Sequence, residues 1–194
     1  FEDSMNAVGV NPYLFHSNTA SGTARTIISA DGERTFATNL GASLELNERV
    51  ITPEIFSKWD YCYVEGYLIA NKPAFTKTIS VAKECGCKVI LDLASFNVVE
   101  DNCEFLNELL PQIDIIFANE EEAKALTQKT AEESLHYIAE NVDIAVVKIG
   151  KKGSLIKRGE EVVQIGCNKI DVVDTTGAGD MYAAGFLYGL IKGY

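Results

Sequence analysis

The sequence has no hydrophobic run long enough to cross a membrane. Its longest nearly apolar stretch, Met181 to Ile191, is about half of the roughly 20 residues that a membrane-spanning helix needs. Hydrophobic residues make up 47% and charged residues 23% of the 194 positions, close to the average of globular proteins. This composition excludes a disordered, fibrous or membrane-embedded chain, and the length predicts one domain with at most a small appendage.

Basic residues are scarce. The chain has 17 Lys and Arg against 28 Asp and Glu, which gives a net charge of −11. An acidic surface repels phosphate unless a local patch overrides the repulsion. We therefore expect neither a nucleic-acid polymer nor a membrane as partner, and the balance favours a small substrate.

The five cysteines lack the spacing of a disulfide framework or a metal site. An odd number of scattered thiols favours a reducing compartment, so we expect a cytoplasmic protein. The first residues, Phe1 to Ser4, are neither basic nor followed by an apolar core, so no signal peptide is expected. The chain opens without an initiator Met and stops directly after a helical pattern, so we expect a fragment of something longer.

Residues 11–46 form a candidate β region. Thr23–Ala30 and Glu33–Asn39 are rich in Thr and Ile, and Asp31-Gly32 between them readily supplies the positive φ angles of a type I′ turn. These features predict a β-hairpin. Its faces are not strongly apolar, so the ribbon needs another part of the protein to lie against.

From about residue 50, short β-branched runs alternate with helical patterns. The runs are continuously apolar, which is typical of strands buried on both faces of a parallel sheet. Repeated strand and helix predict an α/β layered sheet with right-handed crossovers. The predicted strands are Tyr61–Val64, Val89–Leu93, Ile113–Ala118 and Ala145–Ile149, and the predicted helices are Ala74–Lys83, Cys103–Leu110, Glu120–Leu126 and Ala131–Glu140. A hairpin over Ser154–Lys157 and Val162–Ile165 and a helix from Ala178 to about Lys192 follow.

The segment from Asp174 to Asp180 carries the clearest chemistry. Gly177, Ala178 and Gly179 remove bulky side chains from the start of a predicted helix, so a phosphate can touch the free backbone N–H groups at its positive end. Asp180 places a carboxylate beside this cradle, which makes sense if it takes a proton from a hydroxyl group that attacks phosphorus. Alternatively, Asp180 only caps the helix and the glycines only form a tight turn.

The fourteen residues from Asp174 to Leu187 resemble the signature of the ribokinase-like (PfkB) family of carbohydrate and nucleoside kinases. Other segments also fall where this family has motifs, and the lid segment is most similar to the adenosine-kinase branch; these segments are Gly32–Thr35, Val64–Leu68, Leu91–Leu93, Asn119–Ala123 and Val147–Gly153. The resemblance implies a three-layer α/β sandwich with a mostly parallel central sheet plus a small β lid. The lid would be residues 11–46, and the kinase core would be residues 1–10 and 47–194, incomplete at both ends.

The resemblance also implies an ATP-dependent kinase that phosphorylates a primary hydroxyl (CH2OH) of a nucleoside or sugar. Asp180 would be the general base, and Gly177, Ala178 and Gly179 would form the anion hole. The lid residue Arg34 would reach toward phosphate. ATP would lie along Lys148, Gly150, Gly153 and Asn119, although many members carry Thr where this chain has Lys148.

Metal sites are implied in the same way. Asn119 and Glu122 match the family's Asn-x-x-Glu element, which organises Mg²⁺ and its waters, and Asp92 lies where a second carboxylate often supports that shell. Asp174 matches an acid that helps to hold a monovalent cation, such as K⁺, in some members. Each also has a structural interpretation: Asn119 and Glu122 as a capping box, Asp92 and Asp174 as loop or turn residues, and Arg34 as an exposed surface charge.

Two further points stay open from the sequence. Gly150 to Ser154 superficially resembles a P-loop but lacks its spacing, and we expect a hairpin turn beside the nucleotide. A non-catalytic module that binds a nucleotide or sugar, or that forms a homodimer through the exposed lid ribbon, is the alternative to an enzyme.

Overall fold

The computed structural model describes residues 1–29, 34–172 and 174–194. Its centre is a six-stranded sheet in the order β3-β4-β5-β6-β7-β8. Strands β3 to β6 are parallel, and β7 and β8 continue the sheet antiparallel to their neighbours. The strands are β3 (Tyr61–Glu65), β4 (Lys88–Asp92), β5 (Ile115–Asn119), β6 (Ile144–Lys148), β7 (Ser154–Arg158) and β8 (Glu161–Ile165).

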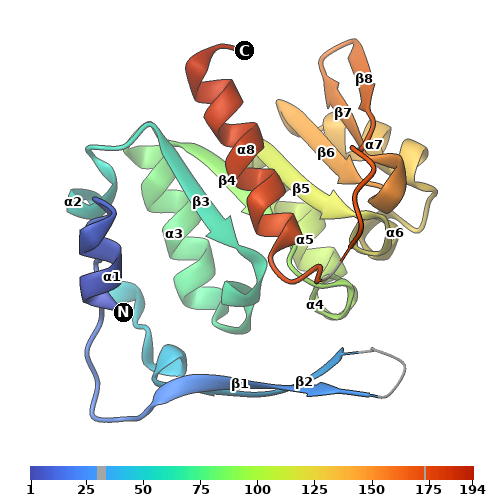
Figure 1. Cartoon of the computed structure of the whole chain (residues 1–194). Coiled ribbons are helices and arrows are strands. Elements are labelled where there is room, and N and C mark those ends of the chain that lie inside the picture. The colour runs from blue at the N-terminus through green and yellow to red at the C-terminus, as the bar shows by residue number, and fades with distance from the viewer. Residues whose placement is uncertain (30–33, 173) are drawn as a thin grey trace.

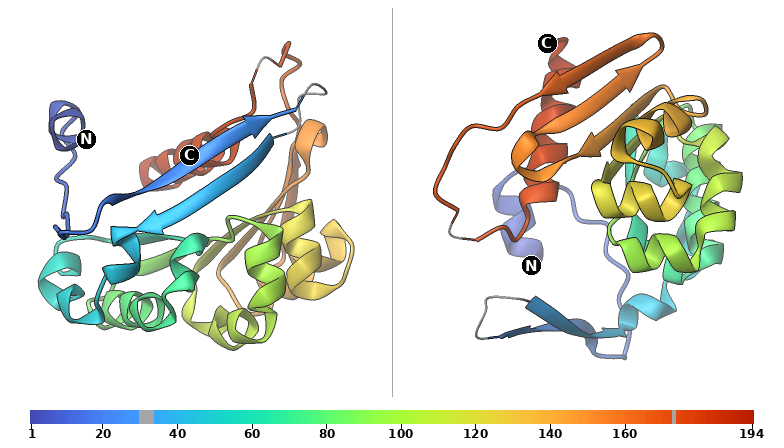
Figure 2. Two further views of the ribbon diagram at one scale, coloured as in Figure 1. Left: turned by 90° about the horizontal axis from the view of Figure 1, so that it is seen from below. Right: turned by 90° about the vertical axis from the view of Figure 1, so that its right-hand side faces the viewer.

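Helices cover both faces of the sheet, which makes three layers (Figures 1 and 2). One face carries the helices that connect the parallel strands, and their buried side chains form the larger core, including Phe75, Ile79, Leu135 and Ile138. These helices are α3 (Lys72–Glu84), α4 (Phe96–Asp101), α5 (Cys103–Leu109), α6 (Glu120–Thr127) and α7 (Ala131–Ala139). The predicted α/β fold class and the alternation of strand and helix are confirmed.

The long helix α8 (Ala178–Lys192) covers the opposite face. Its Tyr182 and Phe186 pack edge-on against Phe117 of β5, with ring centroids 6.3 Å and 5.3 Å from that of Phe117. The Tyr182 hydroxyl also hydrogen-bonds the hydroxyl of Ser154, a buried residue of β7, at 2.7 Å. Aromatic packing and one partly buried hydrogen bond therefore hold the first half of α8 on the sheet.

Burial on both faces is observed for β5 and β6 and for most of β4, but the prediction is wrong for β3. Cys62 and Val64 of β3 are buried against the α3 side, whereas Tyr63 is 41% exposed on the other. In the described part of the chain, β3 is one of the two edge strands of the sheet, and its Tyr63 side is only partly covered, since Tyr61 on the same side is half-buried.

The β-hairpin is confirmed and lies apart from the three layers (Figure 2). Strands β1 (Ser21–Ile28) and β2 (Arg34–Gly41) pair antiparallel, with Thr26 opposite Phe36. The predicted turn at Asp31-Gly32 lies outside the described residues. The strand residues of β1 are exposed along their whole length, as expected of a ribbon without its own core.

Several short elements were not predicted from the sequence. They are α1 (Glu2–Ala7), α2 (Pro53–Phe56), α4, and the 3-10 helices η1 (Ala42–Glu45), η2 (Glu48–Val50), η3 (Gly66–Ala70), η4 (Leu110–Gln112) and η5 (Gly150–Lys152). In the described residues, none of the helices combines the length and apolarity that crossing a membrane requires. All five cysteines are free thiols.

Candidate active site

A cleft of about 880 Å³ opens where the parallel strands end. Each of these four strands ends on a polar side chain: β3 on Glu65, β4 on Asp92, β5 on Asn119 and β6 on Lys148. All four side chains line the cleft, together with the first turn of α8. Ligand sites of open α/β sheets occur at this edge, because the loops after the strands diverge there.

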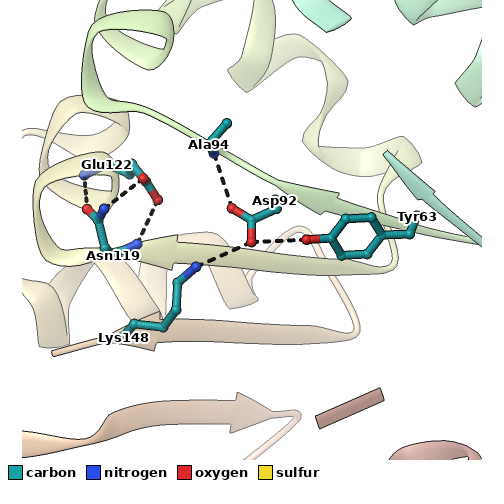
Figure 3. Close-up of polar contacts among 6 residues, drawn as sticks. All are labelled: Tyr63, Asp92, Ala94, Asn119, Glu122 and Lys148. Atoms are coloured by element: carbon teal, nitrogen blue, oxygen red, sulfur yellow. Dashed lines mark hydrogen bonds and ion pairs between the residues drawn. The ribbon is translucent and has the colours of Figure 1, made fainter. Parts of the chain in front are cut away.

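Asn119 and Glu122 form a closed pair at the start of α6 (Figure 3). The backbone N–H and the side-chain amide of Asn119 donate to the Glu122 carboxylate at 2.8 Å and 2.7 Å, and Glu122 N–H donates back to Asn119 Oδ1 at 2.9 Å. The capping box is thus confirmed. Glu122 is only 3% exposed, and this burial raises the pKa of its carboxyl.

Asp92 is the centre of a second polar cluster (Figure 3). Its Oδ1 accepts from the Ala94 N–H at 3.1 Å, and its Oδ2 accepts from the Tyr63 hydroxyl at 3.2 Å and from Lys148 Nζ at 3.3 Å. Ala94 follows the strand with φ at +66°, an uncommon conformation for a residue with a side chain. Asp92 therefore caps the loop after β4, as its structural interpretation predicts. It also forms an ion pair with the ammonium group of Lys148.

The start of α8 faces the same cleft. Gly177 precedes the helix with φ at +75°, and Ala178, Gly179 and Asp180 line the cleft. The Asp180 side chain is exposed, and its Oδ2 lies 3.8 Å from where a Cβ on Gly177 would be. The structure thus places the Asp180 carboxylate in an open cleft beside the bare helix N-terminus, as its predicted role requires.

The two glycines after β6 also line the cleft. Gly150 opens the turn η5, and Gly153 ends it with φ at +97°. A Cβ on Gly153 would lie 1.8 Å from the carbonyl oxygen of Ile165, so only glycine fits there. The predicted hairpin turn is confirmed, and it brings the end of β8 to the rim of the cleft.

One predicted side chain lies outside this group, and another is not described by the structure. Asp174 is not among the residues that line the cleft; its Oδ1 accepts from the backbone N–H and the hydroxyl of Thr176, at 2.8 Å and 2.7 Å. It therefore forms a turn, which is the structural interpretation of this residue. Arg34 begins β2, and its side chain lies outside the described part of the chain.

Sequence reasoning assigned no role to Tyr63, Glu65, Tyr67 and Tyr182, which also line the cleft. Glu65 accepts from the Tyr67 N–H at 3.0 Å, and burial raises the pKa of its carboxyl. Only their positions could have indicated them: Glu65 directly follows a predicted strand, and Tyr182 lies two residues after Asp180.

The cleft does not hold a ready-made metal cage. Among the residues that the structure describes, no three His, Cys, Asp or Glu side chains gather closely enough to bind an ion. The Glu122 carboxylate faces Asn119, and the Asp92 carboxylate faces Lys148. This donor set fits Mg²⁺ that keeps several of its waters and is bound mainly through substrate phosphates, which is the usual state of Mg²⁺ in kinases.

The chain is similar to carbohydrate and nucleoside kinases. The model of the pfkB family carbohydrate kinases matches residues 1–194. A 5-dehydro-2-deoxygluconokinase of Bacillus licheniformis is 29% identical over 164 residues, which are 78% of this chain and 50% of the relative. A ribokinase of Arabidopsis thaliana is 32% identical over 192 residues, 91% of this chain and 48% of the relative. The chain thus spans about half the length of these relatives.

Solved structures agree. The adenosine kinase from Sinorhizobium meliloti is 34% identical with a TM-score of 0.80, and the match covers 87% of this chain and 54% of that one. The ribokinase from Thermotoga maritima is 26% identical with a TM-score of 0.81, over 98% of this chain and 63% of that one. The three-layer sandwich is the fold of these kinases, and the family match spans the whole sequence. The chain therefore belongs to the pfkB family of carbohydrate kinases.

Proposed function

We propose that the protein is an ATP-dependent phosphotransferase that phosphorylates a primary hydroxyl group of a sugar or nucleoside. The observation that carries this proposal is the exposed Asp180 carboxylate in the first turn of α8, beside a glycine-rich helix start and inside the cleft. A carboxylate next to an anion cradle opposes simple anion binding, because it repels the anion. It suits a reaction in which a proton has to leave while negative charge gathers on phosphate.

The proposed step is an in-line displacement. The acceptor oxygen bonds to the γ-phosphorus of ATP, the bond to the leaving ADP oxygen breaks, and Asp180 takes the hydroxyl proton. The backbone N–H groups at residues 177–179 stabilise the charge on the transferred group. Because the protein makes no covalent bond, catalysis depends on positioning and on electrostatic stabilisation.

The nucleotide would lie along Lys148, Gly150, Gly153 and Asn119, where the cleft runs from β6 to β8. When bound, Mg²⁺ neutralises part of the charge on the phosphates. Asn119, Glu122 and Asp92 would hold its waters. We also propose Asp174 as a contact of a monovalent cation such as K⁺, through the turn that it forms with Thr176.

The lid would close over the acceptor. Ile28, Phe36 and Leu40 lie on one face of the ribbon, and Leu40 also lines a smaller cavity beside the cleft, so this face is directed toward the site. Closure excludes water, which would otherwise hydrolyse ATP, and Arg34 would reach the phosphates. The exposed apolar residues of the lid also suit a homodimer, and the free thiols suit the cytoplasm.

A substrate panel tests the proposal. The natural full-length protein is incubated with Mg²⁺, ATP and single candidates such as adenosine, inosine, ribose and fructose, and ADP release is measured by a coupled assay. We expect turnover with one class of compound. Binding of nucleotide or sugar without turnover of any candidate would contradict the proposal and favour the non-catalytic module.

A further inference from the structure

The residues lining the cleft carry unequal charge. In the described part of the chain, the lining includes four carboxylates, Glu65, Asp92, Glu122 and Asp180, but only one cation, Lys148. A cleft of this charge repels a nucleotide, which is itself strongly anionic. One ammonium group and the helix N-terminus therefore have to provide the attraction of the protein itself for phosphate.

Lys148 lies where such an attraction is useful. Its side chain is 17% exposed, and its Nζ lies 3.4 Å from the position that a Cβ on Gly179 would occupy. The absence of that Cβ lets the ammonium group approach the bare turn at the start of α8. An ammonium group has three donors, and in the described residues Lys148 uses one side-chain hydrogen bond, to Asp92 at 3.3 Å.

The bond from Lys148 is not the last hydrogen bond of the Asp92 carboxylate. If Lys148 turned away, Asp92 would keep the Tyr63 hydroxyl on Oδ2 and the Ala94 N–H on Oδ1. No buried carboxylate oxygen would then lose its last donor, which is the arrangement that costs most free energy. Asp92 therefore holds Lys148 over the cradle without being dependent on it.

We infer that Lys148 is a phosphate-binding side chain that exchanges its Asp92 partner for the terminal phosphate of a nucleoside triphosphate. This inference rests on the proposed function, and it deepens the assignment of the cleft. Asp92 then acts on the reaction through Lys148, as a positioning residue for the ammonium group. The triphosphate gains more than the diphosphate, because the cradle at residues 177–179 is the place of the transferred group.

The test is a binding experiment in the natural full-length protein. Affinities for ADP and for a non-hydrolysable ATP analogue are measured by calorimetry in EDTA, so that no metal role of Asp92 enters. Lys148→Met is expected to weaken binding of the triphosphate about tenfold or more and that of ADP less than about threefold, from the usual strength of a charged hydrogen bond. Lys151→Met removes an equal charge from the exposed turn outside the cleft and should change both affinities less than about twofold.

A double substitution separates phosphate contact from simple neutralisation of Asp92. If Lys148 contacts phosphate, Lys148→Met with Asp92→Asn stays as weak for the triphosphate as Lys148→Met alone. Recovery of wild-type affinity in the double variant would overturn the inference. The double variant also has no unpaired buried charge, so it keeps the test available if Lys148→Met alone does not fold.

The failure of the inference and the failure of the proposed function can be told apart. Loss of triphosphate preference in Lys148→Met, with no turnover of any acceptor by the wild type, would support phosphate contact by Lys148 and contradict the proposed function. Normal turnover by the wild type, with unchanged triphosphate binding in Lys148→Met, would overturn the inference and leave the proposed function in place.

Discussion

Two carboxylates of the cleft have different surroundings. Glu122 is buried and bound by Asn119, and its pKa is raised by loss of water, whereas the Asp180 side chain is exposed in the first turn of α8. Pairs of acids in unlike environments are the usual basis for dividing roles in a site. In the proposed reaction, Asp180 would meet the acceptor hydroxyl, and Glu122 would keep a fixed structural or metal-organising position.

The role of Asp180 leads to the first prediction. Asp180→Asn keeps the size of the side chain and removes its ability to accept a proton. In the full protein we expect kcat to fall by roughly 10²–10⁴, since a positioned base is usually worth that factor. Nucleotide affinity should stay the same or rise, because a carboxylate that repels phosphate has been removed. Steady-state kinetics together with calorimetric ADP binding provide the check. A variant with near-normal turnover would remove Asp180 from this role.

A second prediction compares two capping boxes of the same type. Asn119 caps α6 over the buried Glu122, and Thr130 caps α7 over the exposed Glu133. Asn119→Ala should cost about 1–2 kcal/mol of unfolding free energy, near the upper end for a lost cap, because a buried carboxylate also loses a donor. Thr130→Ala should cost about 0.5–1 kcal/mol. Urea denaturation measures both, and equal costs would show that burial of Glu122 adds nothing.

For single residues, the sequence predicts membership of the cleft better than it predicts which side chains contact each other there. Asp180, Asn119 and Glu122 are recognisable because their partners are neighbours along the chain, in a helix turn or a capping box. The bond between Lys148 and Asp92 joins residues 56 positions apart, and neither local pattern contains the other. It depends on β4 and β6 ending at the same edge of the sheet, which only the assembled fold shows.

Among the elements, the antiparallel extension of the sheet determines the rim of the cleft. The chain turns back at Gly153 into β7, and β8 pairs antiparallel with β7. Ile165 at the end of β8 therefore lies level with the end of β6. Without that return, the nucleotide side of the cleft would lack a wall. The close approach of two backbone segments at Gly153 makes this turn sensitive to any added side chain.

A pair of glycine substitutions tests this sensitivity. Gly153→Ala combines a positive φ with a Cβ only 1.8 Å from a carbonyl oxygen, whereas Gly159→Ala has a positive φ of +55° and no atom within 4 Å. We expect Gly159→Ala to cost about 1 kcal/mol and Gly153→Ala about 2–4 kcal/mol, because the second also moves the backbone. Thermal and urea unfolding compare them. Similar costs would mean that the turn at Gly153 relaxes freely.

The sequence predicts the elements well where local signals agree with burial. Continuous apolar runs locate β4, β5 and β6, because both faces of these strands are covered. The helices between them are recognised from their helical patterns. The same signal also locates β3, but the burial on both faces that it predicts is wrong there, because Tyr63 is exposed. Short elements such as α2 have only one helical turn, so their patterns are too brief to recognise.

At the scale of the whole molecule, lysines pair with carboxylates at the end of the sheet opposite the cleft. Lys83 and Lys88, on α3 and β4, pair with Asp114 and Asp143 next to β5 and β6, with Nζ to carboxylate distances of 2.9 Å and 2.5 Å for the pairs Lys83–Asp114 and Lys88–Asp143. The hydrogen bond from Lys88 lowers the pKa of Asp143. Because the side chains of Lys88 and Asp143 are 51% and 59% exposed, their ion pair contributes little at high salt.

The pH dependence of this network follows from the lowered pKa. An acid with a lowered pKa in the folded state stabilises above its unfolded pKa, and the stabilisation is lost as the pH falls. Asp143→Asn should therefore cost about 0.2–1 kcal/mol at neutral pH. The difference from wild type should shrink below about pH 4 and in 1 M salt. Urea unfolding at several pH values measures it, and a constant difference would contradict the assignment.

Self-association is also a property of the whole molecule. Ile27 is 59% exposed on the lid, on the face of the ribbon opposite Phe36 and therefore directed away from the site. If two lids pair through this face, Ile27→Ser should weaken the dimer about tenfold or more, because an apolar side chain loses its buried contact. Thr38→Ser on the face that is directed toward the site is the control. Sedimentation of the full protein measures the dissociation constant, and a monomeric wild type would contradict the lid dimer.

The aromatic contacts beneath α8 have a consequence for how mutations distribute their effects. The helix that carries Asp180 is oriented by the ring contacts of Phe117, Tyr182 and Phe186. The position of the proposed base therefore depends on packing on the other side of the helix from the solvent. Truncation of Phe186 would let α8 shift by a fraction of an ångström, and a reactive geometry tolerates little misplacement. Turnover should then decline in variants that still unfold cooperatively. Such variants would lose the position of the reacting groups before they lose the fold.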